Sequence, residues 1–282
     1  MDKDRLKFGL RLFFRNKGAV IGLIIMTAWI IVAIFAKWIA PYDPYEKIGK
    51  AKRPPAAEYI FGTDQIGRDV FSRTLYGSRV SMVLGFISIG LSAVCGIVLG
   101  LIAGFYTGTF LDTFIMRCMD ALLAFPGMLL AMVIIAALGT GIENVMIAVG
   151  ISNIPQFARL TRASVLSTRQ LDYVEAARTI GATDRRIMFR HIFPNIVSSL
   201  IVLATMEVGN AILVGAGLSF LGMGAQPPSC EWGLATSQGR DLLKKAWWIA
   251  TFPGFAILTV VMSSNLIGDG LRVALDPRMK YE

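Results

Sequence analysis

Charged residues, histidine and cysteine are all scarce in this sequence. Charged residues make up 17% of the 282 residues, with one His and three Cys, whereas soluble domains have about 25% charged residues. A single histidine excludes His-rich metal centres, and the three cysteines form no spaced motif for a disulfide framework or a metal site. Neither the phosphate-binding motif G-x-x-x-x-G-K-S/T nor the nucleophile motif G-x-S-x-G occurs. We therefore predict that the chain is not an enzyme, with no catalytic residue and no metal site.

Long apolar runs, in contrast, are abundant, and apolar residues make up 55% of the chain. Six stretches are almost free of charge: 19–36, 80–104, 121–142, 144–158, 194–220 and 246–268. Glu207 is the one charged residue within them. Several reach the roughly 20 residues that a helix needs to cross a bilayer, and they are continuously apolar rather than alternating, which indicates helices. We predict an all-α integral membrane protein with six transmembrane helices.

These stretches divide the chain into five parts. We predict a tail over 1–18, a first transmembrane helix over 19–40, an external loop over 41–79, a five-helix core over 80–270 and a tail over 271–282. More Lys and Arg lie on the side of both termini than on the other side, so both termini are expected in the cytoplasm. We attribute the net charge of +9 to basic residues that flank the membrane spans and set their orientation. No nucleic-acid partner is therefore expected.

Three local features refine this layout. Within the external loop, a short amphipathic helix along the membrane surface is expected over 64–79, with Asp64 as its cap. Glycines at four-residue spacing predict a face for close helix contact in the second span, and they are Gly96, Gly100 and Gly104. Pro126 is expected to kink the third span.

The most charged segment is 159–191, which also holds the only histidine. Its second half predicts two short helices around a turn, with Leu171, Val174 and Ala177 on one side of the first helix. Gly181 is expected to end that helix with a positive φ. Two amphipathic helices of this kind suit docking into the groove of a partner protein. The alternative is a solvated basic loop that only sets the topology.

The sequence of this segment resembles a motif of a known protein family. Glu175-Ala176-Ala177, then Gly181, then Ile192-Phe193-Pro194 resemble the EAA motif of ABC importer permeases, with Phe193 where that family usually has leucine. Further stretches resemble the C-type permease of dipeptide, oligopeptide and nickel importers. They are Phe61–Arg73, Leu218–Gly224 with Pro227, Pro228 and Trp232-Gly233, and Asn265–Leu271 with Asp276-Pro277-Arg278. The similarity covers nearly the whole chain, in the same order.

This resemblance implies a type I ABC importer permease fold in the cytoplasmic (inner) membrane of a bacterium. It implies a heterodimer with a second, related permease, two ATPase subunits that bind ATP and Mg, and an external solute-binding protein. No cofactor is expected in this chain itself. Glu175, Ala176, Ala177 and Gly181 match the motif that couples the permease to the ATPases. Dipeptides, longer peptides, glutathione-like peptides, nickel chelates and some sugars are all compatible substrates.

Glu207 is the only charge within the predicted spans, and Asn210 lies on the same side of the helix. One interpretation is that both line the translocation path, where a carboxylate could meet a peptide amino terminus. The other is a carboxyl group that is hydrogen-bonded where helices pack. An alternative function, a secondary transporter or channel subunit, would call for several ionisable residues within the membrane.

Overall fold

The computed structural model describes residues 3–275 of the chain, and side chains from Phe8 onward. In this part of the chain every regular element is helical. The elements are α1 (Lys3–Arg15), α2 (Lys17–Ile39), α3 (Val70–Phe105), α4 (Phe110–Leu123), α5 (Gly127–Leu138), α6 (Ile142–Thr168), α7 (Asp172–Thr179), α8 (Asp184–Arg186), a π-helix (Ile187–Ile192), α9 (Phe193–Phe220), α10 (Trp232–Gly239), a 3-10 helix (Arg240–Leu242) and α11 (Trp248–Leu275). The predicted all-α class is confirmed.

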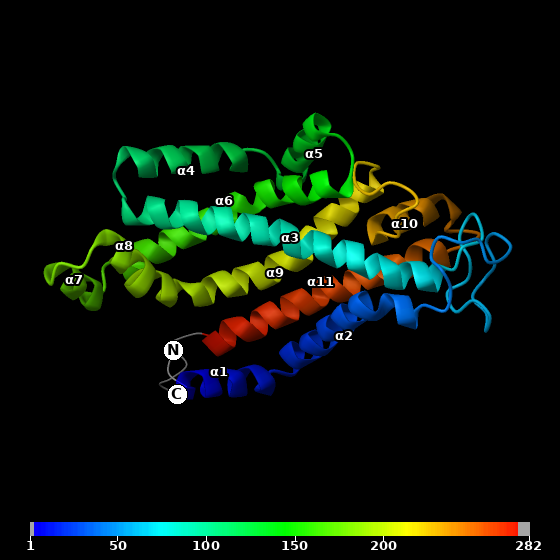
Figure 1. The fold of residues 1–282 in the computed structure, drawn as a ribbon, viewed down its shortest axis with the longest axis horizontal. Helices are drawn as coiled ribbons and strands as arrows, with labels where there is room; N and C mark the ends of the chain where they lie inside the picture. Colours follow the sequence, from blue (N-terminus) through cyan, green and yellow to red (C-terminus); the bar gives the residue numbers. More distant parts are fainter. Residues whose placement is uncertain (1–2, 276–282) are drawn as a thin grey trace.

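Four helices are long and apolar enough to cross a membrane: α2, α3, α8 continued through α9, and α11. The pair α4 and α5 is a fifth candidate, bent by 92° at the break before Pro126. Pro disfavours helical geometry in the residue before it, which explains the break. The sixth long helix, α6, packs along α3 but does not pass the same test of length and composition (Figure 1).

The long helices form an elongated bundle with loops gathered at one end (Figure 1). We call residues 41–69 together with 221–247 the cap, and residues 171–192 the α7–α8 segment, which lies at the opposite end of the bundle. α11 begins at the cap, where the Trp248 indole N–H donates to the Thr63 carbonyl. α1 packs against the last turns of α11, far from the cap.

Close helix contact through small residues is confirmed between α3 and α6. A Cβ on Gly96 would lie 2.5 Å from the Cβ of Phe157, and one on Gly100 would lie 2.5 Å from the carbonyl oxygen of Ala158. Only glycine lets the two backbones approach this closely. The glycine spacing in the sequence therefore identified a real packing face.

The start of α3 differs from the sequence prediction. No separate surface helix forms over 64–79, because α3 begins at Val70 and continues unbroken to Phe105. The N-cap is Asp69, whose carboxylate accepts from the Ser72 N–H across 2.7 Å. The expected cap, Asp64, is engaged with arginines instead. The predicted boundary at residue 80 thus lies inside a helix.

Other boundaries also shift. α4 occupies residues that were expected to be a short connection, and residues 159–168 belong to α6 rather than to a loop. The tail over 1–18 contains α1. The C-terminal motif Asp276-Pro277-Arg278 lies outside the described residues.

Candidate functional site

The α7–α8 segment is two short helices joined by a tight glycine turn. Gly181 has a φ of +81°. Its N–H donates to the carbonyl of Arg178 across 3.0 Å, and the Ala182 N–H donates to the carbonyl of Ala177 across 3.1 Å. This pair of bonds is the Schellman arrangement, which satisfies the last carbonyls of a helix and needs a left-handed residue. The predicted positive φ at Gly181 is confirmed.

One side of the segment is buried against the ends of α3 and α6. Val174 of α7 and Ile187 of the π-helix belong to one apolar cluster with Leu101 of α3 and Val165 of α6. Ala177 is also buried. The segment is therefore seated on the long helices by apolar contacts.

The four residues of the EAA-like motif do not share one environment. Glu175, Ala176 and Gly181 are exposed, whereas Ala177 faces the buried side. The side chain at position 177 can therefore hold the segment against the long helices, whereas the other three positions are accessible to a partner protein.

Large apolar side chains are exposed on the outer side. Ile180, which directly precedes the glycine turn, is 84% exposed, and Tyr173 and Phe189 are also exposed. Leu171 was expected on the buried side and is exposed, because it precedes α7 as its N-cap residue. The sequence interpretation missed Ile180, although an apolar residue beside the turn was the available signal. An apolar surface of this kind is typical of an interface.

The π-helix at the end of the segment leads directly into α9. Pro194, in the first turn of α9, has no N–H, and its ring crowds the carbonyl four residues earlier in α-helical geometry. The wider π turn relieves that crowding. The His191 carbonyl accepts from Asn195 Nδ2 across 2.6 Å and from the Tyr173 hydroxyl across 3.4 Å. These bonds link α7 to the first turn of α9.

Glu207 and Asn210 lie together near the middle of α9. Asn210 Nδ2 donates to Glu207 Oε2 across 3.0 Å. Glu207 is half-buried and Asn210 is exposed. Among the ion pairs found within residues 3–275, none involves Glu207. Polar groups at mid-helix are costly to expose to lipid, so this side of α9 faces water or another protein.

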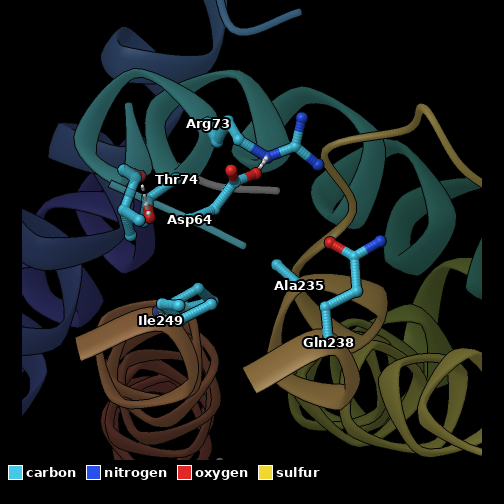
Figure 2. Close-up of a pocket in the computed structure, with 8 residues that line it drawn as sticks. Asp64, Arg73, Thr74, Ala235, Gln238 and Ile249 are labelled. Carbon is cyan, nitrogen blue, oxygen red and sulfur yellow. Dashed lines mark hydrogen bonds and ion pairs between the residues drawn. The ribbon is translucent and has the colours of Figure 1, made fainter. Parts of the chain in front are cut away.

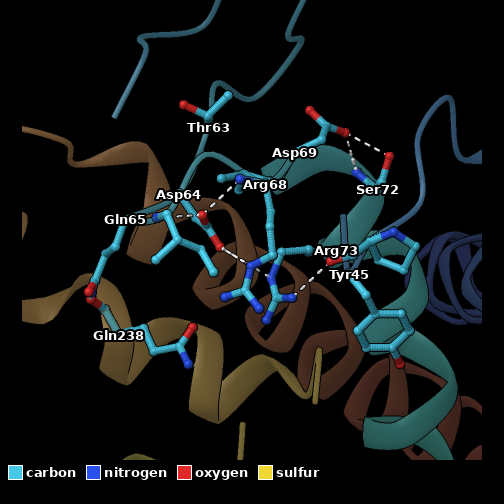
Figure 3. Close-up of polar contacts among 12 residues, drawn as sticks. Tyr45, Thr63, Asp64, Gln65, Arg68, Asp69, Ser72, Arg73 and Gln238 are labelled. Carbon is cyan, nitrogen blue, oxygen red and sulfur yellow. Dashed lines mark hydrogen bonds and ion pairs between the residues drawn. The ribbon is translucent and has the colours of Figure 1, made fainter. Parts of the chain in front are cut away.

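The cap contains a buried cluster of charges that the sequence interpretation did not foresee (Figure 3). Asp64 Oδ2 lies 2.6 Å from Arg68 Nε and 3.7 Å from Arg73 Nε. Arg73 also donates to the carbonyls of Pro44 (2.9 Å) and Ser229 (2.9 Å). The cluster thus fastens both loops of the cap to the first turn of α3.

Glu231 is another buried acid in the cap, with no exposed surface. Its carboxylate accepts from the N–H groups of Gly233 (2.9 Å) and Leu234 (2.8 Å) at the start of α10 and from the Ser81 hydroxyl of α3 (3.3 Å). Burial raises the pKa of Glu231, and the two backbone N–H groups oppose that shift. The sequence offered no signal that separates this glutamate from exposed acids in loops.

A small cavity lies beside the charge cluster (Figure 2). Asp64, Arg73, Gln238 and Ile249 line it, and its volume is about 10 Å³. That volume admits about one water molecule. This cavity is therefore too small to be a substrate site.

Comparisons with known proteins cover almost the whole chain. A family model described as the binding-protein-dependent transport system inner membrane component matches residues 96–281, and the N-terminal TM domain of oligopeptide transport permease C matches residues 8–55. The chain is 45% identical to the di/tripeptide transport system permease protein DppC of Pseudomonas aeruginosa, over 95% of this chain and 90% of the relative. It is 47% identical to the glutathione transport system permease protein GsiD of Escherichia coli, over 96% of this chain and 89% of the relative.

Proposed function

Because the chain belongs to the family of inner-membrane components of binding-protein-dependent transport systems, we propose that it imports short peptides together with a second, related permease. The chain is the permease subunit of an ABC importer, a multi-pass membrane protein that is not itself an enzyme. Membership of this family implies ATPase and solute-binding partners. It also removes the alternative of a secondary transporter or channel.

The proposed substrates are di- and tripeptides, including glutathione-like peptides. The support is the similarity over 95% or more of the chain to relatives whose names specify di/tripeptide and glutathione transport. Both kinds of ligand carry an amino group and a carboxylate on a short backbone. A heterodimeric partner permease would complete the path, and ATP and Mg would be bound by the partner ATPases.

The α7–α8 segment is the proposed contact with the ATPases. Glu175, Ala176 and Gly181 would touch the ATPase, Ala177 would hold α7 on its seat, and Ile180 would insert into an apolar pocket of the partner. The support is the exposed apolar surface beside a turn whose backbone is fixed by two hydrogen bonds. The hydrogen bonds between α7 and the start of α9 provide a route by which movement would reach the membrane.

The proposed orientation places the α7–α8 segment, α1 and the end of α11 in the cytoplasm, with the cap outside. A cysteine at Asp184, which is exposed, would then be labelled only from the cytoplasmic side. A cysteine at Asp241, which is 84% exposed in its side chain, would be labelled from outside. The exposed native Cys118 must first be replaced by serine, whereas native Cys230 is buried. Labelling of Asp184→Cys from outside would contradict this orientation.

Glu207 and Asn210 are proposed to line the translocation path, where the carboxylate would meet a peptide amino terminus. The support is their mutual hydrogen bond and the exposure of Asn210 at mid-helix. Packing of this pair against the partner permease stays the competing interpretation.

The observation that carries the proposal is the exposed apolar surface of the α7–α8 segment in a relative of peptide permeases. The test is reconstitution in proteoliposomes with the partner permease, both ATPases and the solute-binding protein. We expect uptake of labelled dipeptide that requires ATP and is lost without the binding protein. An assembled, ATP-hydrolysing complex that takes up no peptide, and takes up another solute instead, would contradict the peptide assignment.

A further inference from the structure

An apolar groove of about 380 Å³ lies between α3 and α9. α3 contributes Phe86 and Gly90, α9 contributes Ile201 and Ala204, and α2 contributes the buried Met26. These residues lie near the middle of their helices, and all the helices that line the groove are long and apolar enough to span a membrane. The groove is therefore at the depth of the hydrocarbon core.

The groove is lined almost entirely by apolar side chains. Of its two hydroxyl groups, that of Thr205 donates to the Ile201 carbonyl across 2.9 Å, and that of Ser264 is enclosed by protein atoms and has no hydrogen-bond partner among the described residues. Two hydroxyl groups, one of them already engaged and the other enclosed, are too few polar partners for the several water molecules that this volume would admit. An empty space of this size would forfeit dispersion contacts that protein interiors normally retain. The lining chemistry therefore calls for a hydrocarbon.

The surface beside the groove is apolar, as a surface that faces lipid would be. The residues that α3 exposes around it are Val83, Ile87, Val94 and Val98, and none is polar. Asn210 lies nine residues after Ile201, about two and a half helical turns, and so on the opposite side of α9. The polar side of α9 and the groove side thus point in opposite directions.

From these observations we propose that the groove binds one acyl chain of a membrane phospholipid. α3 and α9 touch directly on the cap side of the groove, where Gly85 packs against Ile212. They meet again on the far side, in the apolar cluster that includes Leu101 and Leu200. The acyl chain fills the gap between these two contacts. The proposal depends on the membrane location of the family and not on the transported peptide.

The test uses the assembled transporter in vesicles that contain a phospholipid with a photoreactive diazirine near the middle of one acyl chain. After illumination, mass spectrometry maps the labelled residues. We expect label concentrated around Phe86–Ala93 of α3 and Ile201–Val208 of α9. Gly90→Leu places a side chain in the groove, because no atom lies within 4 Å of a Cβ there, and labelling at these residues should fall several-fold.

The matched control is Gly254→Leu on α11, which also has no atom within 4 Å of a Cβ and lies outside the groove. It should leave the labelling unchanged, and Ala204→Phe should reproduce the loss. Label spread evenly over the outward residues of α2 and α3, or unaffected by both filling variants, would overturn the proposal. Disulfide cross-linking of Gly90→Cys to the partner permease would also overturn it, because a protein would then cover the groove. None of these readouts requires peptide uptake. A result against the lipid site would therefore leave the proposed substrate untouched, and the reverse also holds.

Discussion

At the cap, the charged side chains of Asp64 and Glu231 are buried and bonded within the chain, whereas at the α7–α8 segment large apolar side chains are exposed. Asp64 and Glu231 illustrate the first arrangement, and Ile180 and Phe189 the second. A buried charge is stable only when its partners are in place, and at Asp64 and Glu231 the cap supplies those partners itself. Exposed apolar surface gains stability only when another protein covers it. The cap also exposes apolar side chains, Ile66 and Trp247 among them, so the buried charges are what separate the two ends, and contact with the ATPases is proposed only at the α7–α8 segment.

The largest effect is expected from Gly181→Val. A β-branched residue at a φ of +81° costs about 1–3 kcal/mol and disrupts the turn that presents Ile180. Transport and co-purification of the ATPases should be lost while the amount of inserted protein is unchanged. Immunoblotting of membranes and pull-down of the complex measure both.

Gly222→Val is the matched control in the cap. Gly222 has a φ of +82°, and neither glycine has an atom within 4 Å of an added Cβ. Both variants thus carry the same backbone strain at opposite ends of the bundle. If Gly222→Val also releases the ATPases, the contrast between the two ends is wrong.

A smaller effect is expected from Ile180→Ser. Burial of an isoleucine side chain contributes about 1.5–3 kcal/mol, so the affinity for the ATPases should fall about tenfold or more. Ile66→Ser in the cap removes a side chain of the same type that is 54% exposed, and should leave that affinity unchanged. Titration of the purified permease pair with ATPase subunits provides the numbers, and equal effects of the two variants would argue against docking at Ile180.

In the cap, Glu231→Ala should destabilise the start of α10. It leaves the Gly233 and Leu234 N–H groups without their acceptor, at about 1–3 kcal/mol for each buried unpaired group. Hydrogen exchange of those two amides should accelerate, while ATPase binding is retained. Asp241→Ala, at an exposed site of the cap, is the control. Loss of ATPase binding in Glu231→Ala would show that the two ends are not independent.

The raised pKa of Glu231 also predicts a pH dependence of the cap. The folded state holds the proton more tightly than the unfolded state, so stability is full below the ordinary pKa of 4.5 and is lost as pH rises through the folded pKa. Glu231→Gln removes this titration. Amide exchange in α10, corrected for intrinsic rates, should depend on pH in the parent and not in the variant. Identical pH profiles would refute the titration of Glu231.

The smallest effect is expected midway between the two ends, at Glu207→Gln. The substitution keeps the shape and the hydrogen bond to Asn210 but removes the charge. If the pair lines the path, peptide uptake should change in KM with assembly and basal ATP hydrolysis intact. Unchanged uptake across several peptides would assign Glu207 to packing alone.

The sequence by itself determined the helical class, the face of α3 that packs on α6, and the left-handed turn at Gly181. These features depend on neighbouring residues: a run of apolar side chains, a four-residue glycine spacing, and a glycine between two amphipathic helices. The sequence also identified the EAA-like segment, because its motif is contiguous. Helical spacing placed Val174 and Ala177 on the buried side correctly, because both lie within α7.

Only the tertiary structure decided which partner each polar group takes and which surfaces stay open. Arg73 bonds to carbonyls 29 and 156 residues away in the chain, and Glu231 bonds to Ser81 across 150 residues. Such pairings determine the residue at which a helix begins. They explain why Asp69 is the N-cap of α3 while Asp64 pairs with two arginines. The groove between α3 and α9 likewise depends on where two distant helices touch and where they separate, and no local pattern in the sequence records that distance.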